Sequence, residues 1–302
     1  MQTGTLAEKI LMLKKTRDAV LLVHNYQRPE IQDMADYLGD SLDLSRKAAG
    51  TDHSVIVFCG VMFMAETAKI LSPDKTVLIP QQDAGCPMAR MADVSSLKKL
   101  KAVHPRAKVV TYVNSTAEVK AESDVCCTSA NAVEVVQNVD GDEIIFTPDK
   151  NLASWVARFT NKTIIPWDGY CYVHDQFTVE EVKQARDNHP GALILVHPEC
   201  PPGVADAADA VCSTSGMLKT ALETEAKTIV VGTEEGMIYR LKKAVPEKHF
   251  LSLGTAKMCR GMKLTRPEDV HRSLADLQYP IKISSDIMDR ARAALMRMLH
   301  HA

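Results

Sequence analysis

Three runs of sequence decide the fold: LLVHNYQ at residues 21–27, VVTYVNS at residues 109–115 and LILVHPE at residues 193–199. Each run is leucine-rich or β-branched and then turns polar, a pattern that predicts a buried strand followed by a turn. His24, Tyr112 and His197 hold the same place in these runs and are 88 and 85 residues apart. This spacing indicates a unit that occurs three times along the chain.

Other features recur in the same register. Seventeen residues beyond each reference residue lies a small hydroxyl residue: Ser41, Ser129 and Thr214. Thirty-four residues beyond each lies a second strand-like run, namely VIVF, EIIF or TIVV. At 62, 59 and 62 residues beyond, a cysteine follows a third apolar run: Cys86, Cys171 and Cys259. Helix-like stretches separate the second and third runs: FMAETAKIL, NLASWVARF and GMIYRLKKAV.

These features predict three copies of a strand–helix–strand–helix–strand unit. Alternating strands and helices give parallel sheets, so we expect an α/β fold of three homologous α/β/α sandwich domains around a pseudo-threefold axis. Units this small pack on one another rather than stand alone. The expected domains are residues 1–86, 87–172 and 173–274, with the C-terminal segment 275–302 joined to the first. The stretch RARAALMRML within that segment is expected to form an amphipathic helix packed on the first domain.

Composition excludes several classes of protein. The chain has 302 residues, 46% of them hydrophobic, and a formal net charge of -2, which is typical of an ordinary globular protein without a nucleic-acid surface or a polybasic membrane patch. The longest apolar run has eleven residues, at 55–65, too few to cross a bilayer. The charged N-terminus lacks the pattern of a secretory signal, so we expect a cytoplasmic protein with no nucleic-acid or membrane partner.

The carboxyl ends of the predicted strands carry polar side chains. In open parallel sheets ligands bind beyond these ends, so three such edges facing one axis would meet at a central cavity. The residues concerned are His24, Tyr26, Tyr112, Asn114, His197 and Glu199. Groups of these types exchange protons near neutral pH, and the set is therefore a candidate catalytic centre.

The eight cysteines include no CxxC pair, and Cys86, Cys171 and Cys259 alone share a repeat position in a loop. Three converging thiolates suit a [4Fe-4S] cluster with one iron free to act as a Lewis acid. A three-cysteine zinc site and three unrelated buried thiols are the alternatives. The other five cysteines are expected to be buried or loop thiols. His174, three residues after Cys171, lies within reach of anything bound there.

Ser41, Ser129 and Thr214 begin helix-like stretches. A helix N-cap is the simpler interpretation of each. The free N–H groups of helix N-termini also bind carboxylate and phosphate, so three of them directed inward would suit a small polyanion. For Met62 and Met64, core packing is favoured over a place in the cavity.

Several segments resemble the quinolinate synthase family of NAD biosynthesis: HNYQRPEIQDMADYLGDSLDLS, FCGVMFMAETAKIL, YVNSTAEVKAESDVCCTSANA, HPECPPGVADAADAVCSTSGM and GTEEGMIYRLKKAVPEKHF. They span most of the chain between His24 and Lys263. The resemblance implies three homologous α/β/α domains around a central site, which agrees with the repeat. It also implies a [4Fe-4S] cluster on Cys86, Cys171 and Cys259. Substrate contacts are implied for His24, Ser41, Tyr112, Asn114, Ser129, His197, Glu199 and Thr214, with Tyr26 nearby.

The family reaction implied is a condensation of iminoaspartate (iminosuccinate) with dihydroxyacetone phosphate to give quinolinate, phosphate and two waters, without net redox change. An enzyme that oxidises L-aspartate is the implied functional partner. We expect Glu199 to be the principal acid/base. Tyr26, Tyr112, His24 and His197 are expected to orient the substrates or to act as secondary proton shuttles.

One segment departs from the family pattern. Many relatives carry a second cysteine shortly after the third ligand, whereas this chain has CRGMK at residues 259–263. A redox switch based on such a pair is therefore expected to be absent. Two other classes of function stay open on the residues alone: an iron–sulfur sensor or carrier, and a hydratase with an aconitase-like cluster that acts on a hydroxy acid.

Overall fold

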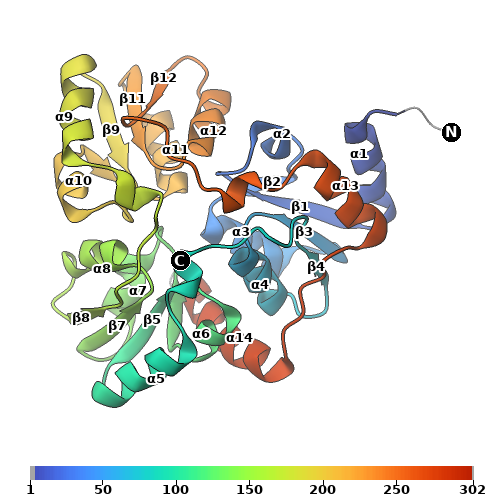
Figure 1. Cartoon of the computed structure of the whole chain (residues 1–302), viewed down its shortest axis with the longest axis horizontal. Coiled ribbons are helices and arrows are strands. Elements are labelled where there is room, and N and C mark those ends of the chain that lie inside the picture. Colours follow the sequence, from blue (N-terminus) through green and yellow to red (C-terminus); the bar gives the residue numbers. More distant parts are fainter. Residues whose placement is uncertain (1–3, 301–302) are drawn as a thin grey trace.

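Each repeat folds as one parallel sheet with helices on its faces, and the three units surround a common centre (Figure 1). The structure is a computed structural model that describes residues 4–300. All strand pairs within the named strands are parallel. The prediction of an α/β fold built from three α/β/α units is therefore confirmed.

Each sheet has four strands rather than the three that the sequence predicts. The first sheet has the order β2-β1-β3-β4, and the other two repeat it as β6-β5-β7-β8 and β10-β9-β11-β12. The additional strand is an edge strand of two or three residues, too short to give a periodic signal. The strand bounds are β1 Ala19–His24, β2 Tyr37–Gly39, β3 Val55–Cys59, β4 Thr76–Leu78, β5 Lys108–Tyr112, β6 Val125–Cys127, β7 Glu143–Thr147, β8 Thr163–Pro166, β9 Leu193–Val196, β10 Ala210–Val211, β11 Thr228–Gly232 and β12 His249–Ser252.

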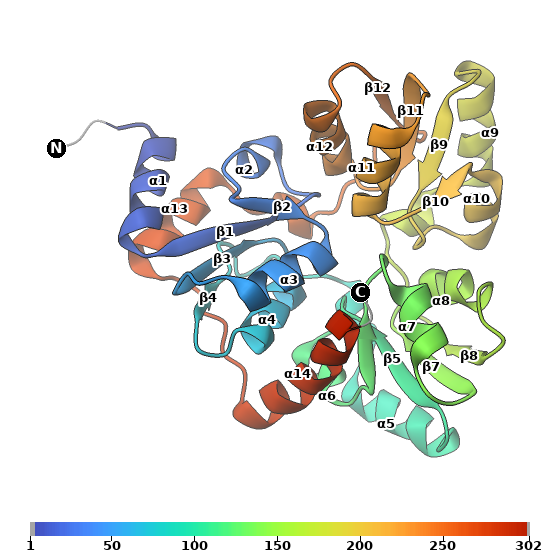
Figure 2. The same ribbon diagram turned by 180° about the vertical axis from the view of Figure 1, so that it is seen from behind.

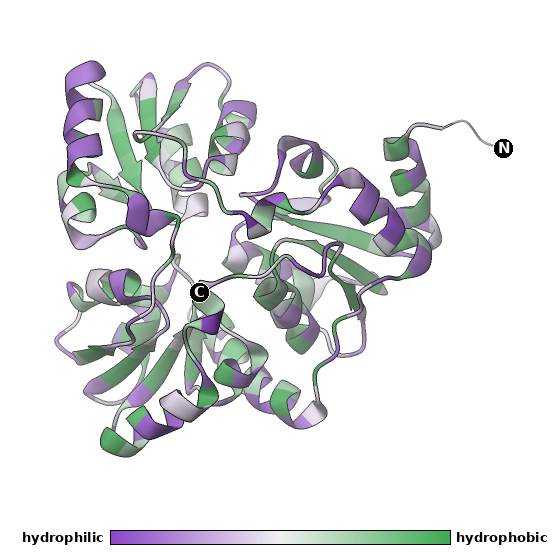
Figure 3. Cartoon of the chain, in the orientation of Figure 1, coloured by the Kyte–Doolittle hydropathy of each residue, from purple (hydrophilic) through white to green (hydrophobic). Residues whose placement is uncertain are grey.

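The central strands are hydrophobic along their length because helices cover both faces of each sheet. Every residue of β1 is buried, and the register pairs Leu22 with Phe58 of β3. The outer helices are amphipathic, and Figure 3 shows hydrophobic strands inside and hydrophilic helix faces outside. This arrangement brings β1, β5 and β9, whose ends carry the predicted polar residues, to the middle of their sheets.

The helices are regular and short. Their bounds are α1 Leu6–Thr16, α2 Pro29–Gln32, α3 Ser41–Gly50, α4 Met62–Leu71, α5 Val94–Val103, α6 Ala117–Ala121, α7 Ala132–Asn138, α8 Lys150–Ala157, α9 Val179–Asn188, α10 Pro202–Ala207, α11 Thr214–Glu223, α12 Gly236–Ala244, α13 Pro267–Asp276 and α14 Ser285–His300. Single 3₁₀ turns are η1 Met88–Arg90, η2 His174–Gln176 and η3 Gly261–Lys263. The three helices expected between the second and third strands are α4, α8 and α12. No helix in residues 4–300 is long and apolar enough to cross a membrane.

The N-cap interpretation of the three hydroxyl residues is wrong. Ser41 and Thr214 are the first residues of α3 and α11, and the caps are Asp40 and Ser213. These caps accept hydrogen bonds from main-chain N–H groups of the first turn. Ser129 precedes α7, whose N-cap is Asn131. The hydroxyls of Ser41, Ser129 and Thr214 are therefore not used as caps.

The C-terminal region differs from expectation. Helix α13, of which residues 267–274 were expected to belong to the third repeat, packs against α1 and β3 of the first. Helix α14 contacts α6 and β6 of the second unit more extensively than α4 of the first. Figure 2 shows α14 beside α6. The apolar residues of α14 fit a crevice between two units, because the core there is shared.

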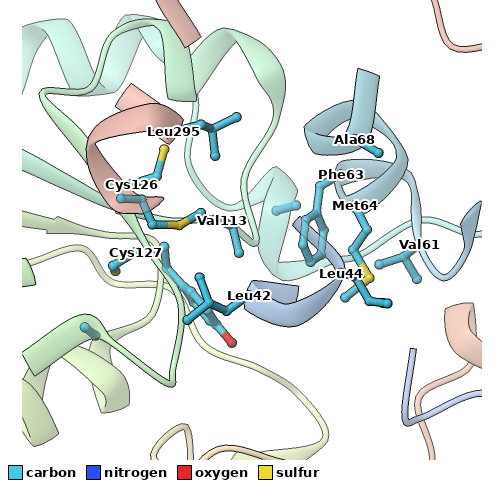
Figure 4. Close-up of a cluster of buried hydrophobic side chains, with 14 of the residues drawn as sticks. Leu42, Leu44, Val61, Phe63, Met64, Ala68, Val113, Cys126, Cys127 and Leu295 are labelled. Atoms are coloured by element: carbon cyan, nitrogen blue, oxygen red, sulfur yellow. The ribbon is translucent and has the colours of Figure 1, made fainter. Parts of the chain in front are cut away.

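The largest hydrophobic core runs through all three units. Its close-up shows Phe63 and Met64 of α4 near Val113 and Cys126 of the second unit, with Leu295 of α14 beside them (Figure 4). Smaller cores lie on the outer faces of the sheets. The shared core explains how units this small are stable together.

Candidate active site

A central cavity lies where the carboxyl ends of the three sheets meet. The residues that the sequence predicted for the site line it together: His24, Tyr26, Ser41, Cys86, Tyr112, Asn114, Ser129, Cys171, His197, Glu199, Thr214 and Cys259. They come from chain segments more than two hundred residues apart. The pseudo-threefold arrangement brings them to one place.

The three cysteines of the repeat lie in loops, each just before a 3₁₀ turn. In each loop a main-chain N–H three residues ahead donates a hydrogen bond to the sulfur; the donors are Ala89, His174 and Met262. Such donors stabilise a thiolate and the bonds that it makes to a metal. The three sulfurs are thus presented in the same way.

The cysteine loops touch one another. A Cβ added to Gly261 would lie 2.3 Å from the Gly85 carbonyl oxygen, so the first and third loops meet backbone to backbone. The Tyr172 hydroxyl accepts a hydrogen bond from the Arg260 N–H at 2.7 Å, which joins the second loop to the third. All three cysteines line the same cavity.

Burial decides the state of the thiols in the metal-free chain. It raises the pKa of Cys86 to about 12 and raises the pKa of Cys171 and Cys259 as well. The remaining cysteines do not line the cavity, and all eight are free: Cys59, Cys126, Cys127, Cys200 and Cys212 are the other five. Four of these five are buried, as small apolar residues usually are.

The two repeat-equivalent histidines are neutral donors. The Nδ1 of His24 accepts the N–H of Tyr26 at 3.2 Å, and the Nδ1 of His197 accepts the N–H of Glu199 at 3.3 Å. This assigns the proton of each neutral ring to Nε2. Burial lowers the pKa of both histidines to about 3. The His197 Nε2 lies 3.2 Å from the Ser129 hydroxyl.

Glu199 is an ionised carboxylate in a buried place. Its Oε2 lies 2.6 Å from Nδ1 of His174 and 3.9 Å from Nδ1 of His197. Burial alone would raise the pKa of Glu199, but the close contact with His174 and the hydrogen bond from Tyr112 lower it to about 2. Because its side chain is only 3% exposed, solvent does not screen these interactions.

A chain of close polar contacts joins Glu199 to Tyr26, and its first link is the ion-pair contact between Glu199 and His174. Nε2 of His174 lies 2.8 Å from the Thr233 hydroxyl, and that hydroxyl lies 2.6 Å from the Tyr26 hydroxyl. The imidazole thus connects the carboxylate on one side to two hydroxyls on the other. We call Glu199, His174, Thr233 and Tyr26 the relay. It crosses from the third unit to the first and can move a proton between its ends.

Two side chains of the second unit complete the polar wall. The Tyr112 phenol hydrogen-bonds to Glu199 and Ser129, and burial raises the pKa of Tyr112 well above 10. The Oδ1 atom of Asn114 is buried and has no hydrogen-bond partner among the described residues. A buried acceptor without a partner is costly, and it is therefore suited to a ligand that donates to it.

A different metal arrangement is also present. Ligand atoms of Cys171, His174 and Glu199 lie within 4.8 Å of one another. The carboxylate and the imidazole of this group contact each other at 2.6 Å, and the imidazole also contacts Thr233. We therefore assign His174 to the relay rather than to a metal.

The cavity is also lined by residues that the sequence analysis did not assign to it: Asp40, Val61, Phe63, Met88, Thr128, Val173, Glu234 and Met262. Met64 lines it too, as well as packing in the core. The repeat held a signal for some of these: Val61 and Glu234 lie 37 residues beyond His24 and His197. No repeat position or motif marks Thr233, because its role comes from its contacts with Tyr26 and His174, which lie in other segments of the chain.

This fold and site define a class: a three-unit α/β protein with three thiols, a carboxylate and neutral imidazoles around an enclosed centre. The family model of the quinolinate synthetase A protein matches residues 8–300. The chain is 52% identical to the quinolinate synthase of Methanoregula boonei over 297 residues, 98% of each chain. It is 51% identical to the quinolinate synthase of Pyrococcus horikoshii over 296 residues, 97% of this chain and 98% of the relative.

The chain therefore belongs to the quinolinate synthetase A family.

Proposed function

We propose that the protein is a quinolinate synthase of de novo NAD biosynthesis, a transferase that condenses iminoaspartate with dihydroxyacetone phosphate. Quinolinate, phosphate and two waters are the products, so the reaction is balanced without an oxidant. The observation that carries the proposal is the convergence of the three cysteine loops with Glu199 and the polar strand ends on one cavity. Family membership and the names of the relatives support it.

The donor set fits a [4Fe-4S] cluster on Cys86, Cys171 and Cys259. All three thiols are free, line the same cavity and receive a main-chain N–H. When bound there, the cluster supplies one iron without a protein ligand, a Lewis acid for hydroxyl and carboxylate oxygens. Because burial raises the pKa of these thiols, metal binding must displace their protons.

The chain's own residues bind the two anionic substrates. Ser41 and Thr214 stand at the N-termini of the ten-residue helices α3 and α11 and line the cavity, so the helix dipoles favour carboxylate or phosphate there. His24 and His197 donate from Nε2 without adding positive charge. Asn114 offers its unpaired Oδ1 to a substrate hydroxyl or imine N–H.

Glu199 and the relay handle protons. Since the pKa of Glu199 is about 2, its carboxylate is ionised at neutral pH and accepts the proton that carbon–carbon bond formation releases. The proton then returns to a hydroxyl that leaves as water. The neutral phenols of Tyr26 and Tyr112 donate hydrogen bonds and orient the substrates. These side chains are less than a tenth exposed, which keeps water from hydrolysing an imine.

The cellular setting follows from the same chemistry. Iminoaspartate is an unstable imine, so an enzyme that oxidises L-aspartate must supply it close by. The eight free cysteines suit a reducing compartment, which supports a cytoplasmic location.

Product analysis tests the proposal. The protein is reconstituted anaerobically with iron and sulfide and supplied with iminoaspartate and dihydroxyacetone phosphate, or with a hydroxy dicarboxylate in parallel. A pyridine dicarboxylate in the first reaction supports the proposal. Water addition or loss on the hydroxy dicarboxylate alone would instead identify a hydratase. No turnover on either substrate, with a cluster that oxygen removes, would favour a sensor.

A further inference from the structure

One position next to each cysteine loop recurs in all three repeats. It lies 37 residues beyond each reference residue and is occupied by Val61, Asp149 and Glu234. In each repeat the next residue along donates its N–H to the carbonyl oxygen two residues before the cysteine. The pairs are Met62 to Ala84 at 2.8 Å, Lys150 to Gly169 at 2.8 Å and Glu235 to Lys257 at 3.0 Å. The three side chains therefore face equivalent loops.

In two repeats this side chain is a carboxylate bonded to the cysteine itself. Oδ2 of Asp149 accepts the N–H of Cys171 at 3.0 Å, and Oε1 of Glu234 accepts the N–H of Cys259 at 3.0 Å. Both carboxylate residues are fully buried, with 0% of their surface exposed. The first repeat has Val61 instead, and no acceptor for the Cys86 N–H exists among residues 4–300.

Helix capping does not account for the two carboxylates. The other oxygen of each already serves the following helix: Oδ1 of Asp149 accepts from Leu152 N–H and Oε2 of Glu234 from Gly236 N–H, both at 2.7 Å. Asp93 caps α5 in the same manner through Ser96 N–H, yet it lies on the surface and bonds no cysteine. Burying the second carboxylate oxygen costs free energy unless that oxygen accepts a hydrogen bond, and here the donor is the cysteine N–H.

We propose that Asp149 and Glu234 are positioning residues that hold the Cys171 and Cys259 loops in the ligating conformation, while the Cys86 loop has no such tie. The inference rests on the proposed cluster site. The three ligands would then differ: the loops of Cys171 and Cys259 are held in place before metal binds, whereas the Cys86 loop takes its conformation when metal binds. Glu234 also bonds Lys263, whose ammonium donates to the Tyr26 carbonyl at 2.6 Å, so the Cys259 tie extends to the first unit.

Isosteric substitutions remove the ties with little change in shape. An amide has one acceptor oxygen, so Asp149→Asn and Glu234→Gln each leave one of the two N–H groups without an acceptor. Groups that support metal ligands typically change metal affinity by about 10- to 100-fold when removed. We expect iron release from the reconstituted protein to a ferrous chelator, under anaerobic conditions, to speed up by about that factor in each variant.

Asp93→Asn is the matched control, since it makes the same carboxylate-to-amide change at a helix cap that bonds no cysteine. We expect it to release iron at the wild-type rate. Equal release rates in all four proteins would overturn the inference while leaving the proposed function intact. A wild-type chain that binds no cluster would instead refute the proposed cluster site.

Hydrogen–deuterium exchange of the metal-free protein tests the ties without a cluster. In the wild type, the amides of Cys171 and Cys259 are expected to exchange at least about tenfold more slowly than that of Cys86. Asp149→Asn should speed exchange at Cys171 or at Leu152, and Glu234→Gln at Cys259 or at Gly236, with the other two cysteine amides unchanged in each variant. Equal protection of all three amides in the wild type, or faster exchange at all three in either variant, would overturn the inference.

Discussion

Replacing Glu199 with Gln should lower turnover by orders of magnitude and leave the fold and the cluster in place. The Glu199 side chain is 3% exposed, and its Oε2 lies 2.6 Å from Nδ1 of His174. Glutamine keeps the size and one acceptor oxygen, but it cannot take up a proton at neutral pH. The variant therefore separates proton transfer from packing.

The substitution removes a proton acceptor, which lowers turnover, and a charged hydrogen-bond partner, which lowers stability. General acid–base catalysis contributes about 10²- to 10⁴-fold to rate, so turnover should fall by that factor, or by about 3–5 kcal/mol in activation free energy. A hydrogen bond to a charged group contributes about 1.5–3 kcal/mol to stability. His174 retains its contact with Thr233, so the free energy of unfolding should decrease by an amount near the lower end of that range.

The assay is quinolinate formation by chromatography after anaerobic reconstitution, with iron per chain and visible absorbance measured on the same samples. Glu223→Gln on the exposed end of α11 is the matched control and should retain wild-type turnover. Turnover of Glu199→Gln within about twofold of wild type, with the cluster present, would refute the assignment of Glu199 as the acid/base.

Three further predictions concern the relay, pH and the thiols. Thr233→Val should lower kcat with little change in KM and destabilise the fold by about 1–3 kcal/mol, because it removes the hydroxyl that joins Tyr26 to His174 and leaves only their direct contact at 3.5 Å; Thr233→Ser keeps the hydroxyl and should retain wild-type values. Hydrogen bonds from the His53 ring and from Ser54 lower the pKa of Asp18 to about 2. Asp18→Asn should therefore be less stable than wild type near neutral pH, and urea unfolding should show this difference vanishing between about pH 4 and pH 2. Cys86→Ser should lose the visible absorbance of the cluster after reconstitution, whereas Cys212→Ser, outside the cavity, should retain it; equal absorbance would contradict the ligand assignment.

Much of the fold could be predicted because its signals are local. β1 and β3 are hydrophobic runs between polar turns, and such runs specify buried parallel strands without tertiary information. The edge strands could not be found, since β10 has only two residues and no period. The unit on which α14 packs could not be predicted either, because an apolar helix face does not indicate which surface covers it; α14 contacts both the first and the second unit.

The site residues that could be predicted are those at equivalent positions of the three repeats or at strand ends. Cys86 and Glu199 stand at equivalent or strand-end positions, so counting along the chain was enough to select them. Thr233 has no distinguishing type or spacing; only the approach of the Tyr26 hydroxyl to 2.6 Å gives it a role. A count of 37 residues, which the sequence analysis did not make, puts Asp149 at the position of Val61, but the bond to Cys171 is visible only in three dimensions.

The sequence by itself determined that this chain has three α/β copies, which residues stand at their strand ends, and which three thiols share a position. These follow from periodicity and spacing, which can be counted along the sequence without knowledge of the fold. The tertiary structure alone decided that the strand ends face one cavity, that Glu199 is ionised beside His174, and that two of the three cysteine loops are tied by buried carboxylates. Charge state and hydrogen bonding depend on distance and burial, and residues far apart in the chain acquire these only when the units pack together.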